Sequence, residues 1–279
     1  MKLTLQLIEA YLRRLAEDER SAATIGKYRR DLLRFYEFLP EDKTIDKSAV
    51  LGWKETLVAR RYASSSVNVM LASVNGLLTF AGRPEWRAKF LKRQRAAFCD
   101  ERRELRRADY VRLVETARRE KRPRLTLIME TLCSTGIRVS ELAFVTVEAA
   151  RAGRAELMLK GKCRRILFPA ALARKLLRYA AGLRITRGPI FTDRAGNPVS
   201  RHRVWYEMKK LGARAGVAAS KVFPHNLRHL FARTYYALER DLSKLADLLG
   251  HSSVETTRLY IITAGGEHLR QLDKMKLVI

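Results

Sequence analysis

The sequence predicts a mainly helical (α+β) fold with one small antiparallel β-sheet, divided into two unequal parts. Apolar residues recur every three or four positions along much of the 279 residues, which is the period of a helix. One short stretch has the pattern of a β-hairpin. A strongly basic segment separates the parts. We therefore expect a helical domain over 1–95, a basic linker over 96–107 and a larger domain over 108–279, with a C-terminal tail at 265–279.

Two amphipathic segments define the first part. Residues 21–39 carry an apolar stripe with helical spacing, formed by Ile25, Tyr28, Leu32, Phe35 and Leu39. Ser65 or Ser66 offers the hydroxyl that an N-cap needs, so a further helix is expected to begin there. Gly82 and Pro84 then end that helix. Together these segments predict a small helical bundle.

The second part combines helices with the hairpin. An apolar helical run, Leu125–Cys133, ends near Gly136. Strands are expected at Arg154–Leu159 and Arg164–Phe168, on either side of the turn-like sequence Lys-Gly-Lys-Cys. Later helical patterns cover 170–181, 200–214, 226–238, 241–249 and 253–259.

The composition indicates a packed globular protein with a polyanionic partner. The chain is 47% apolar and 30% charged, which excludes a disordered or collagen-like protein. Its 56 Lys and Arg outnumber 29 Asp and Glu, giving a net charge of +27. Such an excess destabilises a fold by self-repulsion unless a polyanion compensates it, so nucleic acid is the expected partner. A membrane surface is disfavoured because the charge is not concentrated on one amphipathic helix or tail.

Two groups of basic residues are candidate DNA contacts. Lys27, Arg30 and Arg34 lie largely off the apolar stripe, and their charge favours a surface that faces phosphates over a solvated one. Residues 83–107 contain ten basic and four acidic side chains and form either a solvated linker or a strap along a DNA backbone. The candidate contacts in this run are Lys92, Arg93 and Arg95.

The sequence predicts a cytoplasmic protein that does not enter a membrane. No apolar run reaches the length of about 18 residues that a spanning helix needs. The first fifteen residues alternate with helical period and include Glu9, unlike the apolar core of a signal peptide. Cys99, Cys133 and Cys163 are isolated, so neither a disulfide framework nor a thiolate zinc site is expected.

Unusual polar residues gather in four segments of the second part. They are 134–142, 160–165, 225–229 and 249–253, the last followed by Thr-Thr-Arg-Leu-Tyr at 256–260. His225 and His229 stand four residues apart, as two zinc ligands on one helical face would. Arg228 places a permanent cation between them, so we expect no metal there. A capping or core role for both histidines is the other interpretation.

Arginines and histidines that converge on one point suit an anion on which charge develops. Guanidinium forks match the non-bridging oxygens of a pentacoordinate phosphate. A tyrosine hydroxyl can act as the nucleophile when such cations stabilise the transition state. A lysine at a hairpin tip can protonate the leaving oxygen as a general acid.

In their order along the chain, these segments resemble the tyrosine recombinase family of phage integrases and Xer-like enzymes. Thr-Gly-Ile-Arg-Val-Ser-Glu-Leu looks like the family's first arginine box, with Glu141 as a supporting acid. His-Asn-Leu-Arg-His resembles its His-x-x-Arg box, and Leu-Gly-His-Ser-Ser precedes the tyrosine. The resemblance gives as catalytic residues Arg138, Lys160, His225, Arg228, His251 and Tyr260. His229 would stabilise its helix or contact the substrate backbone.

The lysine turn departs from the family pattern. The family usually has Gly-Lys-Gly-x-Lys, whereas this chain has Leu-Lys-Gly-Lys-Cys at 159–163. Lys160 aligns through the glycine that follows it. Lys162 is the alternative general acid and is also a candidate DNA contact.

The resemblance implies a reaction that needs neither a metal nor another cofactor. Tyr260 would attack the scissile phosphodiester to give a 3′-phosphotyrosine, while Lys160 protonates the leaving 5′-oxygen. The two arginines would neutralise the phosphate, His225 would act as an acid or base, and His251 would hydrogen-bond the phosphate. A partner strand would reverse the step, and two rounds would exchange strands through a Holliday junction.

The resemblance also implies partners and an assembly. A core-binding (SAM-like) domain and a catalytic domain would close as a C-shaped clamp on double-stranded DNA that has a specific inverted-repeat core site. Four copies would assemble on DNA, with the tail at 265–279 docked on a neighbouring protomer or in cis. The reaction would integrate or excise a mobile element or resolve replicon dimers. The alternatives are a type IB topoisomerase-like enzyme and a catalytically silent DNA-binding protein.

Overall fold

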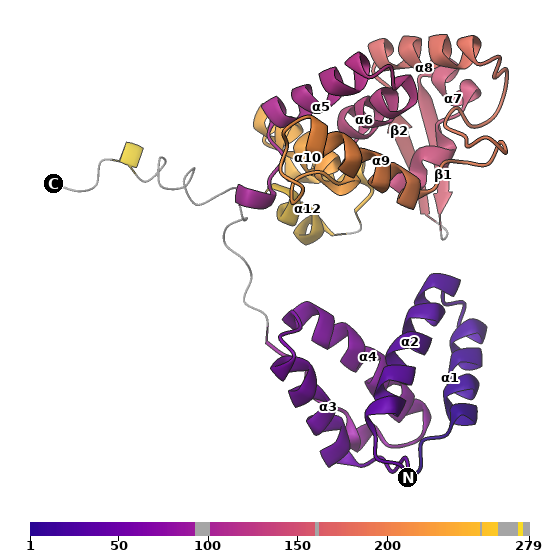
Figure 1. Cartoon of the computed structure of the whole chain (residues 1–279), viewed down its shortest axis with the longest axis vertical. Coiled ribbons are helices and arrows are strands. Elements are labelled where there is room, and N and C mark those ends of the chain that lie inside the picture. Colours follow the sequence, from indigo (N-terminus) through magenta and orange to yellow (C-terminus); the bar gives the residue numbers. More distant parts are fainter. Residues whose placement is uncertain (93–100, 160–161, 252, 262–272, 276–279) are drawn as a thin grey trace. The chain divides into compact units, whose positions relative to one another are not determined.

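The computed structural model describes residues 1–92, 101–159, 162–251, 253–261 and 273–275 (Figure 1). The chain divides into two compact units, Met1–Arg95 and Ala96–Ile279. Both are built mainly from helices, and the second also contains a two-stranded antiparallel sheet. The predicted fold class, mainly helical with one small sheet, is therefore confirmed.

Four helices form the first unit: α1 (Leu5–Glu17), α2 (Ala22–Phe38), α3 (Lys47–Ala59) and α4 (Ser64–Phe80). A short 3₁₀ turn, η1 (Pro84–Trp86), follows them. N-cap side chains accept a backbone N–H at the start of three helices, namely Thr4 before α1, Ser21 before α2 and Asp46 before α3. The apolar faces meet in one core, in which Leu32, Phe35 and Leu39 of the predicted stripe are buried.

The predicted start of α4 is wrong. The helix begins at Ser64 after Ala63, whose methyl group cannot accept a hydrogen bond, and neither Ser65 nor Ser66 is its N-cap. Val67 and Leu71 are fully buried, and this packing holds the first turn in the helix without a side-chain cap.

The second unit is arranged around α6 (Pro123–Thr135). Helices α5 (Arg107–Arg119), α8 (Ala170–Gly182), α9 (Arg201–Arg214) and α10 (Pro224–Glu239) pack against it. The apolar run predicted for this helix is buried in the core, with Leu125, Ile128, Met129 and Leu132 among its members. The remaining elements are η2 (Glu101–Arg103), η3 (Val139–Phe144), α7 (Val147–Ala152), α11 (Leu242–Leu249) and α12 (Val254–Ile261).

The second strand of the hairpin begins earlier than the sequence predicts. Strands β1 (Arg154–Leu159) and β2 (Lys162–Leu167) pair antiparallel, with Arg154 opposite Leu167 and Leu159 opposite Lys162. The second strand thus begins two residues before the predicted one, because the ladder continues through the residues assigned to the turn. β1 packs against α7 and η3, which places the hairpin beside the segment that follows α6.

The described part of the predicted linker packs on the second unit. Leu105 is buried in its core, and Arg107 begins α5. Three backbone carbonyls between residues 102 and 105 accept hydrogen bonds from the side chains of Ser220, Asn226 and Arg233. From residue 102 onward, this basic segment is therefore a folded part of the second unit.

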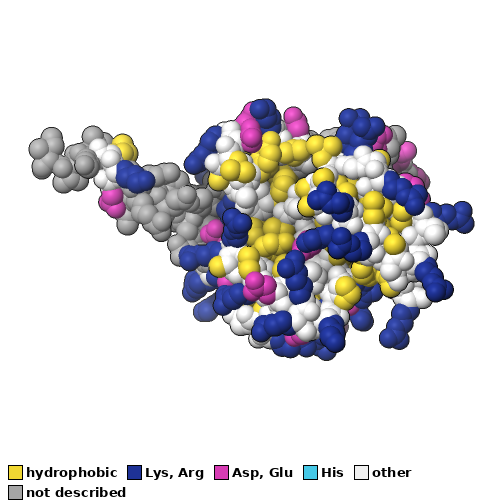
Figure 2. All heavy atoms as spheres, turned by 90° about the horizontal axis from the view of Figure 1, so that it is seen from above, with side chains coloured by type: hydrophobic (Ala, Val, Ile, Leu, Met, Phe, Trp, Pro, Cys, Tyr) yellow, Lys and Arg dark blue, Asp and Glu magenta, His cyan; other side chains and the backbone are white. Residues whose placement is uncertain are grey.

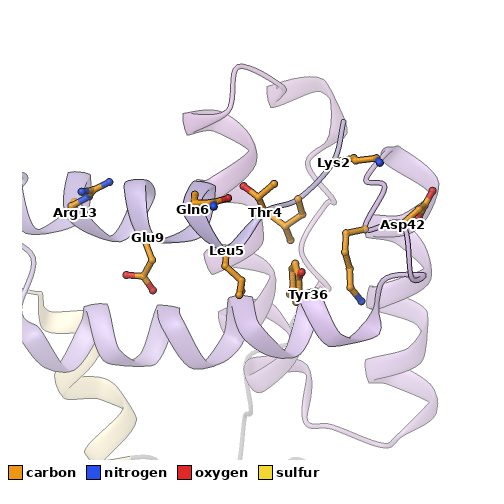
Figure 3. Close-up of a pocket in the computed structure, with 10 residues that line it drawn as sticks. Lys2, Thr4, Leu5, Gln6, Glu9, Arg13, Tyr36 and Asp42 are labelled. Carbon is orange, nitrogen blue, oxygen red and sulfur yellow. The ribbon is translucent and has the colours of Figure 1, made fainter.

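Basic side chains are spread over one face of the molecule, with apolar side chains exposed between them (Figure 2). Figure 2 shows Lys and Arg around the visible face, with few acidic side chains between them. A shallow hollow of about 640 Å³ lies between the start of α1 and the end of α2 (Figure 3). Lysines, arginine, glutamate and aspartate all line it, and none of the candidate catalytic residues does. No helix among the described residues is long and apolar enough to cross a membrane.

Candidate active site

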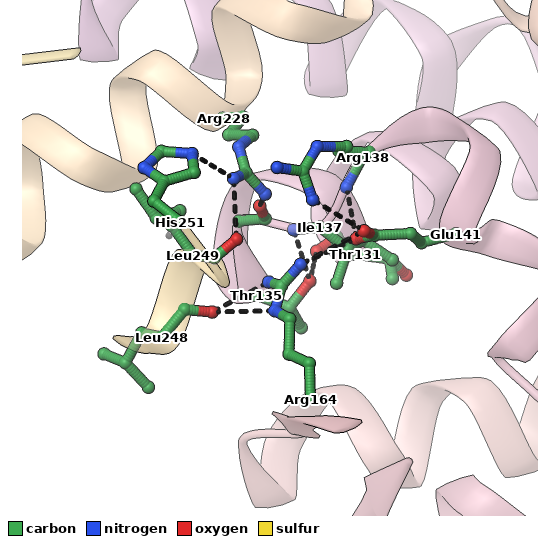
Figure 4. Close-up of polar contacts among 11 residues, drawn as sticks. Thr131, Thr135, Ile137, Arg138, Glu141, Arg164, Arg228, Leu248, Leu249 and His251 are labelled. Carbon is green, nitrogen blue, oxygen red and sulfur yellow. Dashed lines mark hydrogen bonds and ion pairs between the residues drawn. The ribbon is translucent and has the colours of Figure 1, made fainter. Parts of the chain in front are cut away.

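The turn after α6 positions Arg138. Gly136 ends α6 with φ +64°, and a Cβ built there would lie 2.4 Å from the ring of Phe231. This close approach and left-handed backbone require glycine. Arg138 then precedes η3, where its backbone N–H donates to Glu141 Oε2 at 2.8 Å and its Nη1 donates to Oε1 at 2.9 Å. The Arg138 side chain is 42% exposed, whereas Glu141 is buried (Figure 4).

Glu141 is shared with a second arginine, Arg164 on β2. Nη1 of Arg164 lies 3.2 and 2.9 Å from the two carboxylate oxygens. Its Nε and Nη2 donate to the carbonyl of Leu248 near the end of α11, at 3.1 and 2.7 Å. Burial lowers the pKa of Arg164, and Glu141 opposes that effect. Both guanidinium groups stay charged at pH 7, so one buried carboxylate neutralises only half of their charge.

Arg228 on α10 is fully buried, and in the part of the chain that the structure describes no carboxylate is among its partners. Its guanidinium donates to the carbonyl of Gly136 and, at 2.8 Å, to that of Leu249. Nη2 also lies 2.7 Å from Nε2 of His251, while Nε has no hydrogen-bond partner among the described residues. Burial first, and then Arg138, lower the pKa of Arg228 to about 10. A buried cation of this kind is costly to hold and suits an anion as a partner.

The loop after α11 orients His251. Gly250 ends the helix with φ +63°, and His251 follows it. Because Arg228 can only donate, Nε2 of His251 accepts its hydrogen bond. Nδ1 therefore carries the proton and donates to Oγ1 of the buried Thr257, 2.8 Å away.

Tyr260 on α12 lies among these groups. Its side chain is only 8% exposed. Its ring stacks on His229 with centroids 4.3 Å apart, and the rings of His251 and His225 lie 5.0 and 5.2 Å away. The guanidinium carbon of Arg228 is 5.5 Å from the tyrosine ring. Residues from α10, α12 and the loop after α11 thus converge on one point.

All three histidines favour the neutral form. Burial is the main cause at each, and it lowers the pKa of His229 and of His251 to about 4. The same cause, with Arg228 and Arg138, lowers the pKa of His225. At neutral pH these rings can therefore accept protons, and the positive charge of the site comes from its arginines.

The predicted DNA contacts have different surroundings. Lys27 donates to the buried carboxylate of Asp31 within α2, whereas Arg30 and Arg34 are exposed on the same helix. Lys92 is also exposed. Lys160, Arg93 and Arg95 lie outside the described residues, and only the backbone of Lys162 is described, as the first residue of β2.

The sequence analysis missed two polar residues of the site. Arg164 stands two positions from the buried Ile166, so the alternation of the strand places both on the same, inward face. Thr257 is buried and three residues before Tyr260, within the quoted Thr-Thr-Arg-Leu-Tyr segment. Among the residues that the structure describes, no group of three or more His, Cys, Asp or Glu is arranged to hold a metal ion.

Comparison with known proteins assigns both units to one family. Residues 8–85 match the phage integrase N-terminal SAM-like domain, and residues 103–265 match the phage integrase family. The tyrosine recombinase XerC of Roseiflexus castenholzii is 34% identical to this chain, in an alignment that covers 91% of this chain and 87% of that protein.

Solved structures share the fold. A lambda integrase dimer bound to a COC′ core site matches with a TM-score of 0.75 and 18% identity, over 94% of this chain and 95% of that one. A lambda integrase tetramer bound to a Holliday junction matches with a TM-score of 0.73 and 19% identity, over 93% and 77%. With a family match over residues 103–265 and a relative that is 34% identical, the chain belongs to the phage integrase family and is a tyrosine recombinase, an enzyme of DNA strand exchange.

Proposed function

We propose that this enzyme is a site-specific recombinase in which Tyr260 cleaves DNA. The phenolic oxygen would attack the scissile phosphorus, forming a 3′-phosphotyrosine while the bond from phosphorus to the 5′-oxygen breaks. The observation that carries this proposal is the buried Arg228, which lies against the ring of Tyr260 and has no carboxylate partner among the described residues. Such a cation stabilises the charge that develops on a phosphate in the transition state.

Arg138 and Arg228 would hold the two non-bridging oxygens. Figure 4 shows their guanidinium groups next to each other, and Arg138 is, after burial, the next cause that lowers the pKa of Arg228. Glu141 anchors Arg138 through one nitrogen and the backbone, so the remaining donors of that guanidinium are available to a phosphate.

Histidines would accept and donate the protons that move around Tyr260. Neutral His225 can accept the hydroxyl proton of Tyr260 as the bond to phosphorus forms. Thr257 can either accept from or donate to His251, because a hydroxyl does both. A phosphate that drew Arg228 away from Nε2 would free this nitrogen to take a proton, and His251 could then donate to the phosphate. His229, stacked on Tyr260, would hold the ring in place.

The leaving 5′-oxygen would take its proton from Lys160 in the turn between β1 and β2, with Lys162 as the alternative donor. The 5′-hydroxyl of a partner strand would then attack the phosphotyrosine, restoring Tyr260 and joining the strands. No external energy source is required, because the protein–DNA ester conserves the energy of the phosphodiester. Integration, excision and dimer resolution all use this pair of steps.

The assembly is proposed by analogy with the relatives. Four copies would act on double-stranded DNA with an inverted-repeat core site, in the cytoplasm. The first unit, with Arg30 and Arg34, and the second unit would grip the duplex as a clamp. The tail at 265–279, mostly outside the described residues, would dock on a neighbouring copy. The lambda integrase complexes with a core site and with a Holliday junction support these proposals.

The proposal is tested with nicked duplexes taken from the DNA that flanks the gene. The nick lets the cleaved fragment diffuse away, which traps the covalent intermediate. We expect wild-type protein to give a slower, protein-linked DNA band on a denaturing gel in EDTA, and Tyr260→Phe to give none. Equal binding by both proteins without any linked band would contradict the proposal and favour a silent DNA-binding protein.

A second assay separates recombination from topoisomerase activity. Two duplexes with different labels should yield hybrid products if strands are exchanged. Relaxation of supercoiled DNA without hybrid products would instead indicate a type IB topoisomerase-like enzyme.

A further inference from the structure

Arg164 occupies a place that the proposed reaction does not use. It lies on β2 opposite Leu157, and its side chain is only 10% exposed. Gly250 leaves it little room, since a Cβ built on that glycine would lie 2.3 Å from Cδ of Arg164. A long charged side chain buried this closely must have specific partners to offset its lost hydration.

Those partners join two segments of the candidate active site. One nitrogen of Arg164 bonds Glu141, which also holds Arg138. The other two bond the carbonyl of Leu248. The next carbonyl, that of Leu249, accepts from Arg228. Arg164 therefore ties the Arg138–Glu141 pair to the end of α11, the helix that leads to His251.

Arg164 also changes the net charge around Glu141. With Arg164 present, Arg138, Arg164 and Glu141 carry a net charge of +1. Without Arg164, the buried Glu141 would be matched by Arg138 alone, and the three positions would carry no net charge. Arg138 would then be drawn toward Glu141, and the site would offer a phosphate less positive potential.

We propose that Arg164 is a positioning residue of the strand-cleavage reaction, which shares the Glu141 carboxylate so that Arg138 remains available to the phosphate. It also fixes the end of α11 against β2, and so the placement of His251. This role rests on the proposed function, because it requires a phosphate at Arg138. Arg164 touches neither the substrate nor the reacting atoms.

The test measures the single-turnover cleavage rate on the trapped nicked duplex at saturating protein. The dissociation constant for the duplex and the melting temperature are measured separately. The variants are Arg164→Gln, Arg164→Lys and the double variant Glu141→Gln/Arg164→Gln. The matched control is Arg165→Gln, because Arg165 is the next residue of β2 and its side chain is exposed, where it pairs with the equally exposed Glu156.

We expect Arg164→Gln to slow cleavage by about 10²-fold while DNA affinity stays near that of the wild type. Arg165→Gln should change the cleavage rate by no more than about twofold. The double variant also removes the Glu141 carboxylate, which Arg138 alone would otherwise hold. It should therefore cleave about tenfold faster than Arg164→Gln. Arg164→Lys keeps the charge without the fork and should fall between Arg164→Gln and the wild type.

Two results would overturn the role of Arg164: wild-type cleavage by Arg164→Gln, or a double variant no faster than that single variant. The second would mean that the arginine only packs the hairpin. If Arg164→Gln does not fold, the cleavage rates of Arg164→Lys and of the double variant are compared with that of Arg165→Gln instead. Rates equal to that of Arg165→Gln would then overturn the role of Arg164. Failure of the wild type itself to form a linked band would refute the proposed function, which is a distinct outcome.

Discussion

Arg228 illustrates how a single residue reveals the chemistry of this site. Its partners among the described residues are two backbone carbonyls, a neutral histidine and the side chain of Tyr260, and none of them is a carboxylate. A buried cation without a carboxylate costs several kcal/mol of stability. The fold tolerates that cost at the point where Tyr260 and the histidines meet, which is where a phosphate would supply the missing negative charge.

The pKa shifts at the same point predict how stability depends on pH. The pKa of His229 is about 4 in the folded protein, below its ordinary value of 6.5, so protonation favours the unfolded chain. Its contribution is present above pH 6.5 and is lost as the pH falls toward 4. We expect the melting temperature of the wild type to fall between pH 7 and pH 5.

His229→Phe keeps the stacking on Tyr260 but cannot be protonated. The loss of unfolding free energy between pH 7 and pH 5 should be smaller in this variant than in the wild type by on the order of 1 kcal/mol. Thermal or urea unfolding at both pH values measures it. His202→Phe, on the exposed side of α9, is the control and should keep the wild-type slope. An unchanged slope in His229→Phe would contradict the low pKa.

At the scale of elements, the C-terminal ends of helices were predicted better than the hairpin or the start of α4. Gly136 ends α6 because its φ is positive and Phe231 lies against it, and a glycine in the sequence already indicates such an end. The start of β2 depends on pairing with β1, which local sequence does not encode. The bonds of Arg164 to Glu141 and Leu248 depend on tertiary packing, so the sequence alone did not reveal them.

The turn at Gly136 gives a prediction about stability and activity together. In Gly136→Ala, the alanine must adopt a left-handed backbone and its Cβ must displace the Phe231 ring. In Gly153→Ala, the alanine needs the same left-handed backbone, but no atom lies within 4 Å of its Cβ. The control should lose about 1 kcal/mol of unfolding free energy, and Gly136→Ala clearly more, in denaturant titrations. The cleavage rate of Gly136→Ala should also fall, because the carbonyl of residue 136 accepts a hydrogen bond from Arg228 and would shift with the turn. Equal losses by both variants would contradict this account.

At the scale of the whole molecule, the net charge of +27 serves two proposed roles. Basic side chains would bind the DNA backbone, and the arginines of the candidate active site would stabilise the reacting phosphate. Composition predicted a polyanionic partner, and the resemblance to the recombinase family predicted which residues meet around Tyr260. Arg138, His225, Arg228 and His251 do lie close to one another in the structure, whereas Lys160 lies outside the described residues. Two of the motifs follow helix ends that the sequence marks, because Gly136 and Gly250, each with a positive φ, end α6 and α11 shortly before Arg138 and His251.

Phosphate binding by the first unit should be visible in the salt dependence. Arg30 and Arg34 are exposed on α2. The variant Arg30→Gln/Arg34→Gln should weaken DNA binding and reduce the log–log salt slope by about 2, one for each lost phosphate contact. Its cleavage rate at saturation should match the wild type. Arg14→Gln, equally exposed but ion-paired with Asp18, is the control, and the same slope in both variants would contradict the contact.

The most direct test of the central claim is to locate the DNA on the protein. The covalent complex is trapped on the nicked duplex, digested with nuclease and protease, and analysed by mass spectrometry. We predict that the nucleotide remnant is linked through a 3′-phosphate to Tyr260. A remnant on Tyr235 or Tyr236 of α10, or on a residue other than tyrosine, would contradict the mechanism.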